Sequence, residues 1–238
     1  MRVYLLKDMV TKNESEMRNW SKIASIINYG NSPHKLYVVS RSHTAIIFKI
    51  TFADYHYFIL DQLYRPDETP RNEDTKMRAR AEMNSIVYSL YSALDSLANE
   101  INLAYNFGIG ENKIQITHNH PKSKYPKSKS DCVRCSLDNK NDKLKSTLNQ
   151  ELSQNWFVLF NKLRNQITHK NLPVIHQSYS NDAMHIAIPE DPTEMNPNIH
   201  TKLVEINVFC MDLRNYVLRA TERVLDLLEI PIKNTFNL

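Results

Sequence analysis

Glycine is the residue that most constrains this chain, because only three of its 238 residues are glycines. Tight turns, dinucleotide-binding crossovers and phosphate-binding loops need backbone at positive φ or close approach to a phosphate, and glycine supplies both. Gly30, Gly108 and Gly110 cannot form a G-x-G-x-x-G or a G-x-x-x-x-G-K-[ST] motif. A classical nucleotide-binding α/β fold is therefore not expected.

Three long segments, at about 75–107, 142–170 and 201–229, repeat apolar residues at spacings of three and four. This spacing is the pattern of one buried helix face. A further apolar run, residues 44–64, is rich in β-branched residues but too long for a strand, so we predict a helix there as well. The first long segment has the clearest apolar stripe: Met83, Val87, Leu90, Leu94, Leu97, Ile101 and Ala104. The expected fold is all-α, an antiparallel helical bundle.

Two parts are expected along the chain. Residues 1–70 are predicted to be a mostly helical N-terminal extension, to which the sequence assigns no role. Residues 71–238 are predicted to form the helical domain, with loops at 108–141 and 171–200. In the second loop, the alternating stretch 184–188 predicts a short isolated strand.

Composition also bears on the compartment. Three cysteines, an odd number, do not suggest a disulfide framework. No apolar run approaches the roughly 18 residues that would span a bilayer, and the apolar stretch near Met1 is too short for a secretory signal. We therefore expect a cytoplasmic protein without membrane contact. Histidines such as His43 and His56 share no spacing, and we predict them to lie at the surface or to be partly buried.

Residues 113–145 carry nine lysines or arginines against three aspartates. Such a basic segment fits contact with a polyanion, of which RNA is the natural candidate, although a solvated lysine-rich loop has the same composition. His118, His120, Cys132 and Cys135 lie in this segment, and together they can offer the four ligands of a structural zinc site. A disordered loop is the alternative, and we predict neither a catalytic metal nor a cofactor.

The second long segment ends in a polar face with little charge. Its apolar side consists of Trp156, Phe160, Leu163 and Ile167. Away from that side lie Asn161, Arg164, Asn165, Thr168 and His169, with no acidic residue between 155 and 170. Exposed helix faces usually carry Glu and Lys, so this face favours a groove or an interface. A solvated face whose terminal histidine interacts with the helix dipole is the simpler alternative.

Arg164, followed directly by Asn165 and then by His169 at the end of a bundle helix, resembles the motif of the HEPN superfamily. The stretch 92–102 is similar to the first core helix of stand-alone HEPN proteins. The resemblance covers roughly residues 75–230. It implies a HEPN-like bundle and a metal-independent endoribonuclease, which cuts RNA by 2′-hydroxyl transesterification.

The resemblance also implies the roles of the residues. Arg164, Asn165 and His169 form the expected catalytic site, which two copies of the chain complete as a homodimer. Histidine can take or give a proton near neutral pH, and arginine presents a forked cation to phosphate oxygens. Asp95 is a weaker candidate to orient one of them. HEPN toxins silenced by AMP transfer carry a tyrosine where this chain has Asn171, so that control is not expected.

The family further implies a toxin–antitoxin or anti-phage setting, with an antitoxin or immunity protein as a partner. Two other interpretations remain open. The chain can be a non-catalytic HEPN module that binds a nucleotide or a protein partner. It can also be a structural helical protein in which Arg164 and His169 only cap a helix.

Overall fold

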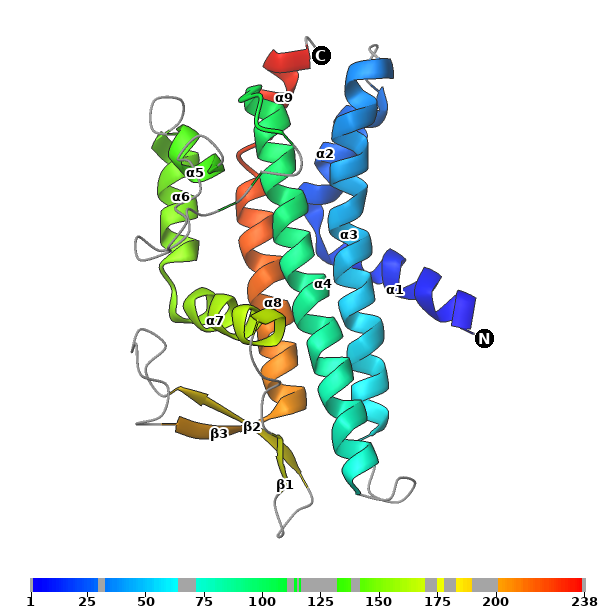
Figure 1. The fold of residues 1–238 in the computed structure, drawn as a ribbon. Helices are drawn as coiled ribbons and strands as arrows, with labels where there is room; N and C mark the ends of the chain where they lie inside the picture. The colour runs from blue at the N-terminus through cyan, green and yellow to red at the C-terminus, as the bar shows by residue number, and fades with distance from the viewer. Residues whose placement is uncertain are drawn as a thin grey trace. The chain divides into compact units, whose positions relative to one another are not determined.

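The computed structural model describes residues 2–29, 33–63, 72–110, 114, 116, 132–137, 142–169, 175–177, 183–189 and 201–236. Within these residues the chain is mostly helical and forms a helical bundle, as predicted, together with a small sheet. In chain order the elements, drawn in Figure 1, are α1 (Arg2–Glu16), α2 (Arg18–Tyr29), α3 (Pro33–Gln62), α4 (Glu73–Tyr105), α5 (Val133–Ser136), α6 (Asp142–Leu152), α7 (Asn155–His169), β1 (Ile175–Gln177), β2 (Met184–Pro189), β3 (Thr201–Glu205), α8 (Ile206–Leu225) and α9 (Glu229–Phe236). None of these helices has the length and apolar character needed to cross a membrane.

The helices α3 and α4 confirm two of the predicted helical segments. Every position of the apolar stripe of α4, from Met83 to Ala104, is buried. In α3, Val39, Ile46 and Ile50 share one buried face, so packing at helical spacing outweighs the strand preference of their β-branched side chains. The two helices run antiparallel (Figure 1).

The chain folds into two compact units. Unit 1 comprises Met1–Lys49, Ser92–Leu152 and Leu218–Leu238, and unit 2 comprises Ile50–Tyr91 and Ser153–Val217. The helices α3, α4 and α8 each contribute residues to both units. The division into an extension and a domain at residue 70 stays a prediction.

A buried polar cluster joins α2, α3 and α4 inside unit 1. The rings of Trp20 and His43 stack with their centroids 4.8 Å apart, and Trp20 Nε1 donates to the carbonyl oxygen of His43 at 2.8 Å. His43 Nδ1 lies 2.9 and 3.0 Å from the two carboxylate oxygens of Glu100. His43 is 2% exposed and Glu100 is 0% exposed. The prediction that His43 is at most partly buried was therefore wrong, because its partner lies 57 positions away in the sequence.

The strand predicted at 184–188 exists but is not isolated. It is β2, the middle strand of an antiparallel sheet with the order β1–β2–β3. Ile175 of β1 faces Ile186, and Val204 of β3 faces the same residue from the other side. Both edges of β2 are therefore paired, which no local pattern in the sequence indicates.

The third long segment was predicted to be helical from Thr201, and its first residues are instead the strand β3. Thr201–Glu205 carries mostly exposed side chains and so lacks a buried helix face, whereas its backbone pairs with β2. The helix α8 begins at Ile206 and ends at Leu225. Pairing with a distant strand decided the conformation of these five residues.

The second long segment was predicted to be one helix over 142–170, and it forms two, α6 and α7. Leu144, Leu148 and Leu152 are buried from α6, and Trp156 and Phe160 are buried from α7. In a straight helix each step of four residues adds about 40° beyond a full turn. Over the four steps from Leu144 to Phe160 the buried side would therefore rotate by about 160°. A break between the helices lets each of them face its own core.

Candidate functional site

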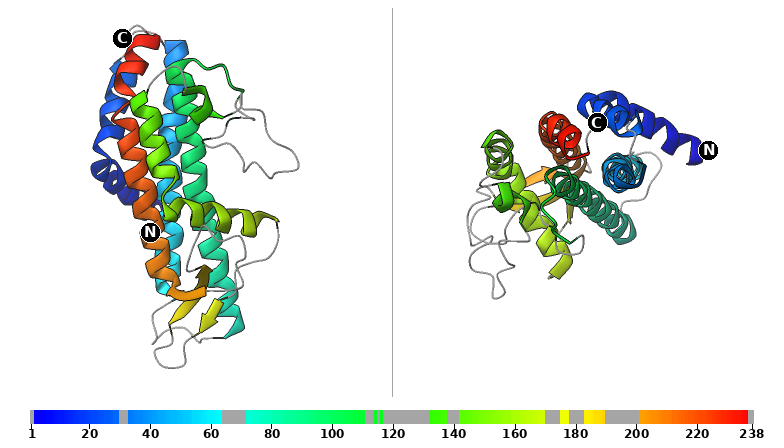
Figure 2. Two further views of the ribbon diagram at one scale, coloured as in Figure 1. Left: turned by 90° about the vertical axis from the view of Figure 1, so that its left-hand side faces the viewer. Right: turned by 90° about the horizontal axis from the view of Figure 1, so that it is seen from above.

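The predicted site residues lie at the C-terminal end of α7 in unit 2. Arg164 is half-buried and Asn165 is exposed. His169 is the last residue of α7, and its side chain lies outside the described residues. Within this unit α7 crosses α4 at a steep angle, as both Figure 1 and the left view of Figure 2 show. The polar face of α7 therefore meets side chains of α4.

The Arg164 side chain packs on an aromatic ring of α4. Its Cζ atom lies 4.7 Å from the centroid of the Tyr91 ring, a cation–π contact. Arg164 Nη1 donates to Asn165 Oδ1 at 3.1 Å. The Tyr91 ring meets Phe160 edge to face at 5.5 Å, and its hydroxyl donates to Asn161 Oδ1 at 3.4 Å. The guanidinium of Arg164 thus lies over the Tyr91 ring, and the contacts of this ring with Phe160 and Asn161 join it to α7.

The charge of Arg164 is not compensated by a described acidic side chain. Among the described residues its hydrogen-bond partner is the neutral amide of Asn165. A guanidinium has five N–H donors, and Asn165 accepts from only one of its nitrogens. The remaining donors suit the oxygens of a phosphate, which arginine binds with two parallel hydrogen bonds.

A second tyrosine of α4 contacts the same turn of α7. The Thr168 hydroxyl donates to the carbonyl oxygen of Arg164 at 2.8 Å, and the Tyr88 hydroxyl lies 3.1 Å from Thr168 Oγ1. A carbonyl oxygen can only accept, so the single proton of Thr168 is already used. The Tyr88 hydroxyl is therefore the donor in its bond to Thr168.

The face of α4 that carries these tyrosines continues toward the start of the helix. Arg80, Asn84, Tyr88 and Tyr91 lie within an arc of about 80° at 100° per residue. Arg80 Nε and Asn84 Oδ1 are buried and have no hydrogen-bond partner. An unpaired buried polar group costs about 1–3 kcal/mol, so water or a ligand that reaches these atoms would be favoured.

Of the predicted site residues, Arg164 and Asn165 are joined by a hydrogen bond. Asp95 belongs to unit 1 and lines a cavity of about 420 Å³ there with Arg41 and Asn99, and its role in orienting Arg164 or His169 stays a prediction. Tyr88 and Tyr91 were missed. Their signal in the sequence is a pair of aromatic residues three positions apart on a long helix, off its apolar stripe.

Of the four residues that can supply zinc ligands, His118 and His120 lie outside the described residues. Cys132 is buried, precedes α5, and its Sγ accepts from the backbone N–H of Cys135 at 3.3 Å. No group of three or more metal-ligand side chains occurs in the part of the chain that the structure describes. Of the basic segment 113–145, most residues are likewise outside that part.

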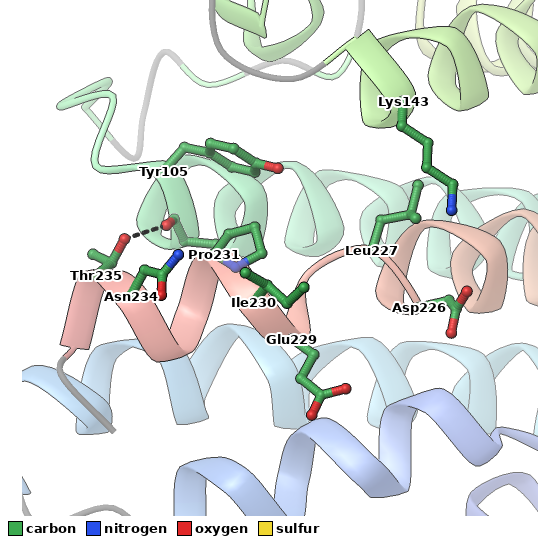
Figure 3. Close-up of a pocket in the computed structure, with 10 residues that line it drawn as sticks. Tyr105, Lys143, Asp226, Leu227, Glu229, Ile230, Pro231, Asn234 and Thr235 are labelled. Carbon is green, nitrogen blue, oxygen red and sulfur yellow. Dashed lines mark hydrogen bonds between the residues drawn. The ribbon is translucent and has the colours of Figure 1, made fainter.

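Unit 1 also contains a cavity of about 530 Å³, drawn in Figure 3. Figure 3 shows the Tyr105 ring on one side, and the Lys143 amine and the Asp226 carboxylate toward the other. Thr235 Oγ1 donates to the carbonyl oxygen of Ala104 at 2.5 Å and so fixes α9 against the end of α4. The cavity contains no residue of the predicted catalytic motif.

Comparison with protein-family models, with curated proteins and with solved structures found no match to this chain. What the site can do chemically therefore follows from its residue types. Arg164 offers a permanent cation, Asn165 an amide that orients it, and His169 a group that can exchange protons near neutral pH.

Proposed function

We propose that this chain is a metal-independent endoribonuclease of the HEPN type. One observation carries the proposal. Arg164 is held over the Tyr91 ring and oriented by Asn165, without an acidic partner among the described residues, on the helix that ends at His169. A cation positioned in this way, close in the chain to a proton-transfer group, suits chemistry on a phosphate.

In the proposed reaction the 2′-hydroxyl of one ribose attacks the adjacent phosphorus. The P–O2′ bond forms, the P–O5′ bond breaks, and the products are a 2′,3′-cyclic phosphate and a free 5′-hydroxyl. The imidazole of His169 takes the proton of the 2′-hydroxyl, and an acid protonates the leaving 5′-oxygen. Arg164 stabilises the negative charge that develops on the phosphate oxygens.

We propose a homodimer as the active form. Arg164 and His169 are five positions apart on one helix, which separates them by about 140° around its axis. Two such motifs that face each other supply two imidazoles and two guanidinium groups to one phosphate. The histidine of the second copy can then be the acid that the leaving oxygen needs.

A nuclease that needs no metal is active wherever it meets RNA. We therefore also propose a cytoplasmic setting in which an antitoxin or immunity protein restrains the enzyme, as in toxin–antitoxin or anti-phage systems. Capture of a neutralising protein encoded beside this chain, and relief of toxicity when both are expressed, would test this proposal.

The first prediction concerns cleavage of a mixed RNA pool by the purified protein in EDTA. We expect His169→Ala to lower the cleavage rate by about 10²- to 10⁴-fold, because proton transfer contributes that much. We expect Arg164→Ala to lower it by about 10²- to 10³-fold through lost charge stabilisation. Gln166→Ala, an exposed residue on the same turn, is the matched control and should cleave like the wild type.

Each alternative outcome is informative. Equal cleavage by the wild type and by His169→Ala would show a contaminating nuclease and reject the proposed function. Silence of all proteins would favour the non-catalytic binding module. A large loss of thermal stability in His169→Ala, without any cleavage to lose, would favour the helix-capping role. Product ends that alkaline phosphatase removes without prior acid treatment would reject the cyclic phosphate.

A further inference from the structure

Tyr88 is a large aromatic side chain that is 41% exposed. It lies on α4 one turn before Tyr91, whose ring carries Arg164. Tyr91 cannot offer its own ring in the same way, because Arg164 covers one face and Phe160 lies at 5.5 Å. Of these two tyrosines, Tyr88 is therefore the one with exposed surface next to the turn of α7 that carries Arg164.

The position of the Tyr88 ring is fixed before any ligand arrives. Its hydroxyl donates to Thr168 Oγ1, and Thr168 donates in turn to the carbonyl oxygen of Arg164. This chain of two hydrogen bonds ties the ring to the turn of α7 that carries Arg164 and Asn165. A ring held in place loses little side-chain entropy when a flat ligand stacks on it.

Two buried polar atoms on the same face of α4 have no hydrogen-bond partner. Arg80 Nε, a donor, and Asn84 Oδ1, an acceptor, are buried without partners two turns and one turn before Tyr88, respectively. Together with Arg164, this face offers cations, an amide and an exposed ring. Proteins that bind single-stranded nucleic acid combine the same features, a positively charged surface for the backbone and aromatic rings for the bases.

We propose that Tyr88 stacks on a base of the RNA next to the phosphate that Arg164 binds. This inference rests on the proposed ribonuclease function and assigns how its site holds a nucleotide. Stacking accepts any base, because every base has a π-face. Tyr88 is thus a positioning residue that adds affinity without adding sequence specificity.

A structural role is the competing explanation, since the Tyr88 hydroxyl could serve only to hold the end of α7. Three variants in a His169→Ala background separate the two roles. Tyr88→Leu removes the ring and the hydroxyl, Tyr88→Phe removes only the hydroxyl, and Thr168→Val removes the group that accepts from it. Phe58→Leu is the matched control, because Phe58 is a ring of α3 in unit 2 with 40% exposure.

The measured quantity is the Kd for a single-stranded RNA of mixed sequence, with circular dichroism as a check of folding. We expect Tyr88→Leu to weaken binding by about 5- to 150-fold, the range found for one base stacked on an aromatic ring. Tyr88→Phe and Thr168→Val should cost much less, and Phe58→Leu should leave the Kd unchanged. Equal losses in all three site variants, or an unchanged Kd in Tyr88→Leu, would overturn the proposal.

A second measurement needs no substitution in the protein. RNAs that lack one base, at each position in turn, are bound to the same His169→Ala protein and to its Tyr88→Leu variant. One abasic position should weaken binding to the former but not to the latter, because the missing base is the one that stacks. Absence of such a position would overturn the inference. Failure of the proposed function would be seen separately, as wild-type cleavage that His169→Ala does not lower.

Discussion

The position of Arg164 depends on a ring from another helix. Its guanidinium lies over Tyr91, and Asn165 accepts one of its N–H groups. A cation–π contact of this kind contributes about 0.5–2 kcal/mol, depending on how far it is shielded from water. The motif in the sequence therefore identifies Arg164 as the cation, whereas the Tyr91 ring that contacts its guanidinium comes from α4.

Two replacements of Tyr91 distinguish the contribution of its ring from that of its hydroxyl. We expect Tyr91→Leu to lower kcat/KM for RNA cleavage by about 2- to 30-fold, the rate equivalent of the lost cation–π contact. Tyr91→Phe keeps the ring and should retain most of the activity. A fluorogenic RNA assay measures both variants. If Tyr91→Phe proved as defective as Tyr91→Leu, the bond of the hydroxyl to Asn161 would be the important contact instead.

At the scale of elements, charged residues tie α9 to α2 within unit 1. Glu229, the first residue of α9, forms ion pairs with Lys22 of α2 and with Lys233 of its own helix. Hydrogen bonds from these two lysines lower the pKa of Glu229 from 4.5 to about 2, and the same carboxylate raises the pKa of Lys22. An acidic residue is also favoured at a helix N-terminus by the helix dipole.

This pair of bonds predicts a dependence of stability on pH. A carboxyl group with a lowered pKa in the folded state contributes stability that is fully present above pH 4.5 and is lost as the pH falls toward 2. The Tm of Glu229→Gln should therefore lie below that of the wild type at pH 6, and the difference should shrink at lower pH and at high salt. Differential scanning fluorimetry of both proteins measures this difference in Tm. A Tm difference independent of pH would mean that the ion pairs do not contribute.

At the scale of the whole molecule, α2 and α3 share buried contacts with α4 inside unit 1. The His43–Glu100 pair is the clearest case, because His43 Nε2 also lies 2.8 Å from the carbonyl oxygen of Trp20. That nitrogen is the donor in this bond, since a carbonyl only accepts. The other ring nitrogen, Nδ1, faces the buried carboxylate of Glu100.

Removal of one partner should expose the cost of burying the other. We expect Glu100→Ala to lower the free energy of unfolding by about 3–5 kcal/mol, because it leaves Nδ1 of the buried imidazole without a partner. Replacement of both residues, His43→Leu with Glu100→Leu, should cost less than Glu100→Ala alone, since two apolar side chains need no partner. Urea unfolding followed by tryptophan fluorescence measures both proteins. A double variant less stable than the single one would contradict this explanation.

The sequence by itself determined the helical character of the chain. Apolar residues at spacings of three and four define the buried face of α4 from Met83 to Ala104 without reference to any other segment. The same local logic predicted the helix of residues 44–64, because strands rarely reach that length. It also placed Arg164 beside Asn165, since adjacent residues of a helix are close whatever else the chain does.

Only the tertiary structure decided what depends on contacts between distant segments. Ser153 and Asn155 are residue types that favour helix starts, yet no proline or glycine marks the break between α6 and α7. Pairing with β2 turned Thr201–Glu205 from a helix start into a strand. Tyr88 and Tyr91 became part of the Arg164 site because α7 packs across α4. Periodicity reports which face of a segment is buried, and it carries no information about the residues that face it.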